Sequence, residues 1–171
     1  HYMLDRYRLP LDFENLLWLS EVLQAEGMKI GVEHWRSQMP RTMGALYWQI
    51  NDCWPVASWS STDYYGTWKA LHYFAKRFYS PVLVAAIASG NVLYIFGISD
   101  LQAPVDAELH WSVQTYSGNL LREETLSVDI EPGKSQILLS KTLDELKGDF
   151  GEDKVYFYCE LSRQGRNLSS N

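Results

Sequence analysis

Residues 43–59 read MGALYWQINDCWPVASW, and this stretch decides how the rest of the chain is interpreted. It opens with an apolar run, residues 43–48, which predicts a strand buried on both faces. Two amides and the carboxylate of Asp52 follow at once, and Trp54 and Trp59 close the stretch. A buried strand that ends in an indole, amides and a carboxylate is typical of the mouth of a (β/α)8 barrel, where functional side chains lie at the carboxyl ends of the strands. These groups suit a sugar, because an indole stacks on its apolar C–H face while amides and carboxylates bind its hydroxyl groups.

Helical patterns lie on both sides of this stretch. An apolar stripe predicts a helix over residues 13–26, which Gly27 ends as a left-handed residue just past the last turn. A shorter helix is predicted over residues 31–39. After a polar loop, apolar side chains recur at helical spacing over residues 68–79. The order helix, helix, buried strand, polar loop and helix predicts that residues 1–79 are the last one and a half βα units of a (β/α)8 barrel.

Residues 80–171 change from helical spacing to the alternation that is typical of strands. Six strands are predicted, at residues 82–88, 92–98, 107–115, 126–130 and 155–161, with a further one that begins at residue 137. Strands at this spacing predict an immunoglobulin-like β-sandwich, in which Trp111 should be buried because it is in phase with Leu109 and Val113. Such a sandwich has about seven strands, and the chain stops where the seventh should begin. We therefore expect a sandwich that lacks its final strand, with an open edge along residues 155–161 that permits self-association.

Charge and cysteine content narrow the possible partners. Residues 1–79 carry eight basic and eight acidic side chains, and residues 80–171 carry seven and thirteen, so the net charge of −6 lies in the second part. No basic patch is present, which argues against nucleic acid and anionic membranes as partners. The longest apolar runs are too short to span a bilayer. Cys53 and Cys159 form no disulfide framework or metal spacing, so we predict buried or partly buried thiols and neither a metal nor a cofactor.

Three segments carry a resemblance to a known family: LLWLSEVLQAEGMKIGVEHWR, MGALYWQINDCWPVASWSSTDYYG and TWKALHYFAKRF. From Phe13 to Pro81 the chain resembles the end of the catalytic barrel of the β-mannosidases of glycoside hydrolase family 2, and the remainder fits the sandwich domain that follows that barrel. The resemblance implies a fragment of a retaining, exo-acting β-mannosidase that hydrolyses terminal β-D-mannose residues, with a β-mannoside glycoside or oligosaccharide as substrate. The chain begins at His1 without a methionine or a signal peptide, so we expect a piece of a longer protein.

The resemblance also suggests which residues contact the sugar. Trp48 resembles the barrel-strand tryptophan that stacks on the sugar in the cleavage subsite, although a core indole is the alternative. Asn51 and Asp52 are candidate hydrogen-bond partners of sugar hydroxyls or of catalytic groups, with a structural role in the loop as the alternative. Trp54 is a candidate for the rim of the pocket. The two catalytic carboxyl groups of the resembled family come from earlier barrel strands, so we predict no catalytic residue here and expect the chain alone to be inactive.

Other polar residues are interpreted as structural. Glu33 and His34 could form an acid/base pair, but both lie in a predicted outer helix, where an exposed glutamate or a packed histidine explains them. His72 lies on the apolar stripe of its helix and is predicted to be a hydrogen-bonded core histidine. The triplet at residues 167–169 is a formal glycosylation acceptor that chance also explains. The sequence predicts no compartment.

A second class of function stays open, namely a carbohydrate-binding or structural β-sandwich module of another family 2 glycosidase, of the β-galactosidase or β-glucuronidase type. A binding module needs aromatic side chains on an exposed face of the sandwich. The only tryptophan of the predicted sandwich is Trp111, which is predicted to be buried. The sequence therefore favours the β-mannosidase fragment over the binding module.

Overall fold

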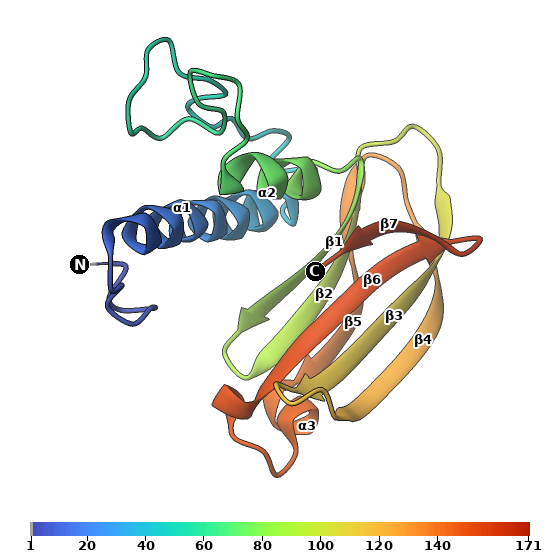
Figure 1. The fold of residues 1–171 in the computed structure, drawn as a ribbon. Helices are drawn as coiled ribbons and strands as arrows, with labels where there is room; N and C mark the ends of the chain where they lie inside the picture. The colour runs from blue at the N-terminus through green and yellow to red at the C-terminus, as the bar shows by residue number, and fades with distance from the viewer. Residues whose placement is uncertain (1) are drawn as a thin grey trace. The chain divides into compact units, whose positions relative to one another are not determined.

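The computed structural model describes residues 2–171, and for Glu152 it describes the backbone only. The chain divides into two compact units. The first comprises residues 2–33 and 44–79, and the second comprises residues 34–43 and 80–171. Figure 1 shows that the first unit contains helices and irregular segments, whereas the second consists mainly of two β-sheets.

One long helix, α1 (Phe13–Arg36), replaces the two helices that the sequence predicts. The prediction that Gly27 ends the first of them is wrong, because buried side chains on both sides of the glycine, Ala25 and Val32, belong to one hydrophobic cluster. Their packing outweighs the roughly 1 kcal/mol by which glycine disfavours a helix relative to alanine. The glycine therefore lies inside the helix, and the chain turns only after Arg36.

Residues 43–48 do not form the strand that their composition predicts. The segment is irregular, and Leu46 and Trp48 are 97% and 74% exposed. A strand needs a hydrogen-bonded neighbour, and in the first unit the described backbone offers only two isolated bridges, both at Thr62. The prediction of a strand buried on both faces is therefore wrong for this chain, and no barrel strand is seen among residues 2–171.

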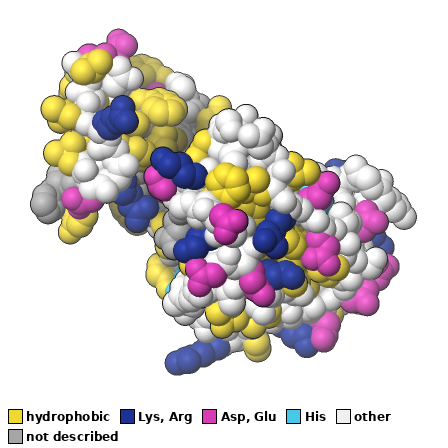
Figure 2. Space-filling view, turned by 90° about the horizontal axis from the view of Figure 1, so that it is seen from below, with side chains coloured by type: hydrophobic (Ala, Val, Ile, Leu, Met, Phe, Trp, Pro, Cys, Tyr) yellow, Lys and Arg dark blue, Asp and Glu magenta, His cyan; other side chains and the backbone are white. Residues whose placement is uncertain are grey.

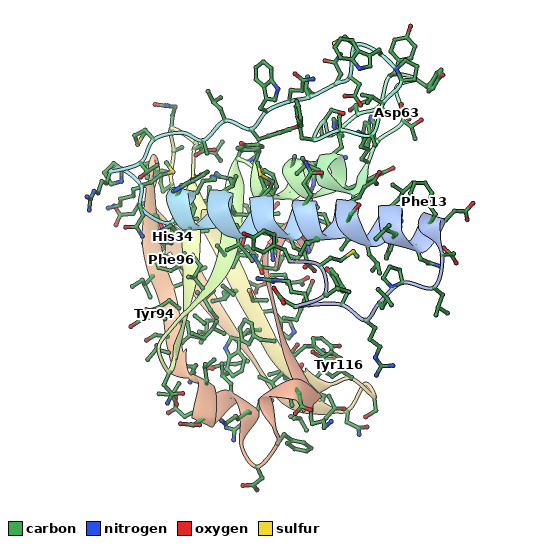
Figure 3. The ribbon with its side chains drawn as sticks, turned by 90° about the vertical axis from the view of Figure 1, so that its left-hand side faces the viewer. Phe13, His34, Asp63, Tyr94, Phe96 and Tyr116 are labelled. Atoms are coloured by element: carbon green, nitrogen blue, oxygen red, sulfur yellow. The ribbon has the colours of Figure 1, made fainter. Side chains whose placement is uncertain are left out.

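The helix predicted after the polar loop is confirmed as α2 (Ala70–Phe78). The core of the first unit consists of buried side chains from α1 and α2: Ala25, Val32, Leu71, Ala75 and Phe78. Figure 3 shows Phe13 at the start of α1 and Asp63 in the loop that precedes α2. The loop that contains Asp63 leads directly into α2, which packs in this core.

The second unit is a sandwich of two antiparallel sheets (Figure 1). One sheet has the order β1-β2-β5, with β1 (Val82–Ser89), β2 (Val92–Ser99) and β5 (Lys134–Thr142). The other has the order β4-β3-β6-β7, with β3 (Val105–Thr115), β4 (Leu120–Ile130), β6 (Val155–Arg163) and β7 (Arg166–Ser170). A short helix, α3 (Leu143–Lys147), and a 3-10 turn, η1 (Glu152–Lys154), lie between β5 and β6. The six strands and the sandwich that the alternation predicts are confirmed.

The prediction of a missing final strand is wrong. Strand β7 pairs antiparallel with residues 160–163 of β6, which pairs with β3 on its other side, and Asn171 exchanges backbone hydrogen bonds with Cys159. The edge predicted to be open is therefore covered along residues 159–163, whereas no described strand pairs on this side with residues 155–158. The turn between β6 and β7 consists of Gln164 and Gly165, whose φ angles are 51° and 74°. Positive φ at both residues is typical of the type I′ turn of a two-residue hairpin. Self-association through the remaining edge of β6 stays a prediction.

The predicted burial of Trp111 is confirmed, since 4% of its surface is exposed. Its indole stacks on Phe157 with the ring centroids 6.0 Å apart, inside the cluster that fills the sandwich. Cys159 is buried in the same cluster, as predicted. Cys53 is exposed in the first unit, so the prediction of a buried or partly buried thiol is wrong there.

The surface offers no large region of one charge on the face that Figure 2 shows, where acidic and basic side chains are interspersed. Within residues 2–171, no helix combines the length and the apolar character that crossing a membrane requires.

Gly165→Ala should lower the free energy of unfolding of the sandwich by about 1–2 kcal/mol, because a β-carbon makes the left-handed backbone of this turn unfavourable. Gly165→Asn is the matched control, since asparagine adopts this conformation more readily. Thermal unfolding followed by far-UV circular dichroism measures both variants. Equal stability of the alanine variant and the wild type would contradict the role of this turn.

Candidate functional site

Asp52 lies at the centre of a buried polar network in the first unit. Only 6% of its surface is exposed. Its Oδ1 accepts a hydrogen bond from the Ser58 hydroxyl, and its Oδ2 accepts one of 3.2 Å from the Lys69 ammonium group. A buried carboxylate is tolerated when it is both paired with an opposite charge and hydrogen-bonded. Both conditions are met at Asp52.

The ammonium group of Lys69 has three acceptors. Besides Asp52, it donates to the hydroxyl of Ser60 at 3.0 Å and to the carbonyl oxygen of Ser58 at 3.4 Å. An ammonium group has three protons to donate, so these acceptors use all of them. The backbone N–H of Lys69 donates in addition to the carbonyl oxygen of Ser61 at 2.9 Å. Because Lys69 directly precedes α2, the network ties the start of this helix to the loop before it.

Backbone hydrogen bonds join residues 49–52 to residues 61–62. They run from Ser61 N to Gln49 O at 3.0 Å, from Thr62 N to Ile50 O at 2.8 Å and from Asp52 N to Thr62 O at 3.1 Å. The peptide bond between Trp48 and Gln49 is cis. The first of these hydrogen bonds involves Gln49, so the paired backbone begins at the residue directly after Trp48.

Ser61 connects this backbone pairing to α2. Its buried hydroxyl donates to the carbonyl oxygen of Ile50 at 3.0 Å and lies 2.8 Å from the hydroxyl of Tyr47. The same hydroxyl lies 3.2 Å from Nδ1 of His72. His72 therefore has the polar partner that was predicted for it, although its side chain is half-buried rather than in the core.

The pKa of Asp52 lies below the ordinary value of an aspartate. The hydrogen bond from Ser58 is the largest cause, and Ser60 and Lys69 lower the pKa further, while burial acts in the opposite direction. The ionised carboxylate is therefore the form that the network holds at neutral pH.

We expect the first unit to lose stability as the pH falls through the pKa of Asp52. Because this pKa is depressed in the folded state, its stabilising effect is complete above the unfolded value of about 4 and disappears at lower pH. Asp52→Asn should make the stability less dependent on pH in this range. The dependence should not vanish, since the pKa values of Asp12 and Asp63 in the same unit are also lowered.

Urea unfolding at pH values between about 7 and 3 measures this effect. Far-UV circular dichroism at the helical minimum follows the unfolding of the first unit, because α1 and α2 contain most of the helical residues among residues 2–171. Tryptophan fluorescence is less suitable, since the most buried indole, Trp111, lies in the sandwich. The same pH dependence in the wild type and in Asp52→Asn would contradict the assignment of Asp52 as a stabilising charge.

The four residues predicted to contact sugar differ in their accessibility. Trp48 and Asn51 are exposed, and Trp54 is 63% exposed, so a ligand can reach all three. Trp48 shares its exposure with the neighbouring apolar side chains of Leu46 and Ile50, so its contact with a sugar stays a prediction. Asp52 is buried and has partners at both oxygens, which favours the alternative of a structural role in the loop. The side-chain amide of Asn51 donates to the carbonyl oxygen of Asp52 at 3.3 Å and thereby joins these two candidates.

Glu33 and His34 do not form an acid/base pair facing a pocket. Glu33 is buried and lies 3.9 Å from the ammonium group of Lys29 one helical turn earlier. His34 is exposed. The expectation of an exposed glutamate or a packed histidine is therefore wrong on both counts, while the rejection of the pair agrees with the observed geometry.

Two other carboxylates of the first unit have structural partners. Glu26 accepts a hydrogen bond of 2.8 Å from the hydroxyl of Tyr7. Asp63 accepts backbone hydrogen bonds from Tyr65 at 2.9 Å and from Thr67 at 2.8 Å, which close the loop before α2. In the described part of the chain, no group of three or more histidine, cysteine, aspartate or glutamate side chains is placed to hold a metal ion.

Sequence reasoning missed the role of Lys69, Ser58 and Ser60. The available signals were the position of Lys69 off the apolar stripe of its predicted helix and the run of hydroxyl-bearing residues at 58 and 60–62. Neither signal shows that these groups are buried together. That information comes only from the folded loop.

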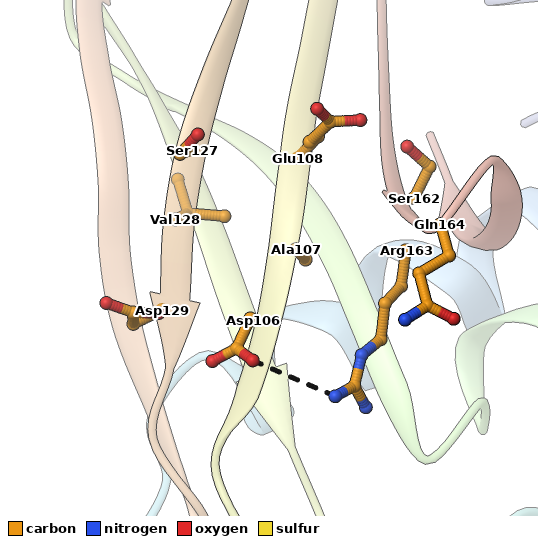
Figure 4. Close-up of a pocket in the computed structure, with 9 residues that line it drawn as sticks. All are labelled: Asp106, Ala107, Glu108, Ser127, Val128, Asp129, Ser162, Arg163 and Gln164. Carbon is orange, nitrogen blue, oxygen red and sulfur yellow. Dashed lines mark ion pairs between the residues drawn. The ribbon is translucent and has the colours of Figure 1, made fainter.

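The outer face of the sheet β4-β3-β6-β7 carries a polar hollow of about 460 Å³ (Figure 4). Across it, the carboxylate of Asp106 and the guanidinium of Arg163 are 3.8 Å apart, and both side chains are largely exposed. Towards the other end of β3, the rings of Tyr116 and Tyr156 lie 5.7 Å apart, and the hydroxyl of Tyr156 donates to Gln114 at 2.9 Å. These exposed aromatic side chains were not predicted, because only Trp111 was considered.

Residues 91–171 match the protein family described as "Mannosidase Ig/CBM-like domain". The β-mannosidases of Capra hircus and Rattus norvegicus are 39% and 35% identical over 92% and 85% of this chain, which covers 19% and 18% of those proteins. The crystal structure of the β-D-mannosidase from Dictyoglomus thermophilum is 30% identical and superposes with a TM-score of 0.90, over 99% of this chain and 21% of that chain. This chain is a relative of the β-mannosidases of glycoside hydrolase family 2. The family resemblance stated from the sequence is therefore confirmed.

The chain spans about one fifth of the length of the β-mannosidases that it matches. The exo-chitosanase of Amycolatopsis orientalis also superposes, with a TM-score of 0.81 and 18% identity, over 99% of this chain and 20% of that chain. At this level of identity the likeness is one of fold alone. The β-mannosidase relationship accordingly rests on the relatives with 30% identity or more.

Proposed function

We propose that this chain is part of a retaining, exo-acting β-mannosidase that hydrolyses terminal β-D-mannose residues. The identity of 39% with a β-mannosidase over 92% of the chain carries the proposal. The exposed indole of Trp48 supports it, because an indole directly beside the hydrogen-bonded segment 49–52 offers a flat apolar surface to a sugar ring. In this proposal Trp48, Asn51 and Trp54 form part of the sugar-binding wall.

In this proposal, residues 1–79 are the end of a (β/α)8 catalytic barrel, and residues 80–171 are the sandwich that follows it. Exposed apolar side chains of the first unit support this: Phe13, Leu16, Leu17, Trp18, Leu46, Ile50 and Val56. Exposed apolar surface of this extent is typical of a region that another element covers. Further strands and helices of a barrel would cover it, and a neighbouring strand would allow residues 43–48 to pair as a strand.

Retaining hydrolysis needs two carboxyl groups about 5–5.5 Å apart, one as nucleophile and one as acid/base. We assign neither role to this chain and propose that the rest of the whole protein supplies both groups. The contribution of this chain is to bind and orient the sugar. Stacking on Trp48 that tightens as the sugar ring flattens towards the oxocarbenium-like transition state would raise kcat as well as affinity.

An assay with an aryl β-mannoside tests the proposal on two samples. We expect the whole protein to release mannose with retention of configuration and the 171-residue chain to release none, because it lacks the catalytic pair. Aryl β-galactosides and β-glucuronides are the control substrates. Cleavage of these instead of the mannoside would contradict the substrate, and turnover by the chain alone would contradict the assignment of the catalytic groups.

Trp48→Ala in the whole protein should reduce catalysis much more than stability. Loss of an aromatic stacking contact worth about 1.5 kcal/mol corresponds to a decrease in kcat/KM of roughly tenfold. The free energy of unfolding should change by no more than about 0.5 kcal/mol, because the proposal places this side chain in the wall of an open sugar pocket rather than in the core. Steady-state kinetics and urea unfolding measure the two effects. A variant that unfolds but keeps full activity per folded molecule would contradict the role in sugar binding.

A second candidate function is non-catalytic binding of saccharide by the sandwich. The adjacent exposed rings of Tyr116 and Tyr156, on the face that carries the polar hollow, favour it. Binding of a manno-oligosaccharide by the whole protein without cleavage would support this candidate. The decisive comparison is between Tyr116→Ala and Trp48→Ala, since only the former should weaken binding to the sandwich.

A further inference from the structure

We infer that Lys69 and Asp52 are positioning residues that hold the sugar-binding segment of the proposed glycosidase, so the inference rests on the proposed function. They fix residues 49–52 against the loop that precedes α2, and thereby fix the backbone on which the indole of Trp48 and the amide of Asn51 are carried. Asp52 is accordingly not a sugar ligand, because both of its carboxylate oxygens are bound within the protein.

Lys69 holds together the two ends of the segment from residue 52 to residue 60. Its ammonium group contacts the carboxylate of Asp52 on one side and the carbonyl oxygen of Ser58 and the hydroxyl of Ser60 on the other. One buried charge therefore joins both ends of the segment from residue 52 to residue 60. The side chain of Lys69 is 12% exposed, so water competes little for these bonds.

Removal of the ammonium group has a local consequence that differs from a general loss of stability. Lys69→Met retains most of the apolar length of the side chain but leaves the carboxylate of Asp52 buried without its opposite charge. The unpaired carboxylate of Asp52 should then move towards solvent, where water hydrates it or supplies a proton. Because the backbone N–H of Asp52 donates to Thr62, such a movement breaks the pairing that fixes residues 49–52.

Hydrogen exchange of the whole protein tests the positioning directly. In Lys69→Met the amides of Asp52, Ser61 and Thr62 should exchange at least tenfold faster, while amides in the second half of α2 keep their rates. Lys76→Met is the matched control, since Lys76 is an exposed lysine of α2, and should leave all these rates unchanged. The double variant Asp52→Asn/Lys69→Met should exchange more slowly at these amides than Lys69→Met, because it leaves no unpaired buried charge.

Two exchange results would overturn the inference. Unchanged exchange at residues 52, 61 and 62 in Lys69→Met would show that the lysine does not hold the segment. A uniform increase over both helices would show a general loss of stability rather than positioning. If Lys69→Met does not fold, Asp52→Asn/Lys69→Met is compared with the wild type instead. Exchange at the amides of residues 52, 61 and 62 that is as slow in this double variant as in the wild type would also overturn the inference.

Kinetics of the whole protein on an aryl β-mannoside test the connection to the sugar. Lys69→Met should lower kcat/KM about as much as Trp48→Ala, and the double variant Trp48→Ala/Lys69→Met should be no worse than Trp48→Ala by more than about twofold. Multiplication of the two effects would show that Lys69 does not act through Trp48. If the wild type cleaves no β-mannoside, the proposed function fails, whereas the exchange experiment still decides whether Lys69 and Asp52 hold the segment.

Discussion

A carboxylate that leaves water must find an opposite charge and hydrogen-bond donors, and Asp52 imposes this constraint on the first unit. Lys69 supplies the charge and Ser58 supplies a donor, so the loop from residue 52 to residue 69 must return on itself for these groups to meet. The loop contains little regular secondary structure of its own. Its order therefore depends on this pair, on the few backbone bonds beside it and on the start of α2.

The two units differ in how well the sequence predicts them, and the reason is physical. In each half-buried strand of the sandwich, apolar residues that face the core alternate with polar residues that face solvent. The position of such a strand can therefore be predicted from its own residues alone. Strand β7 escaped prediction because its five residues carry only one large apolar side chain, Leu168. The glycine of the turn at residues 164–165 was the available signal for this hairpin.

Prediction is poorer in the first unit, because its features depend on partners distant in sequence. An apolar run such as residues 43–48 forms a strand only beside another strand, and composition alone cannot show whether one is present. Gly27 was read as a helix end because glycine commonly has that role, whereas the packing of Ala25 and Val32 overrides it. The sequence predicts polar and aromatic residue types for the candidate site. Which of them would be buried was not predictable, since Asn51 and Asp52 are adjacent in sequence yet lie in opposite environments.

The contrast between a buried network and an exposed indole explains how an irregular segment can serve as a binding surface. An aromatic side chain on a mobile loop loses conformational freedom when a ligand orders it, and this loss weakens binding. At Trp48 the neighbouring backbone is already ordered by the bonds to residues 61–62, so less freedom remains to be lost. The ion pair of Asp52 and Lys69 lies below this surface and needs no contact with the ligand to have this effect. In the proposed function, the residues that order the binding surface would therefore differ from the residues that touch the sugar, and only the latter can be sought among the exposed side chains.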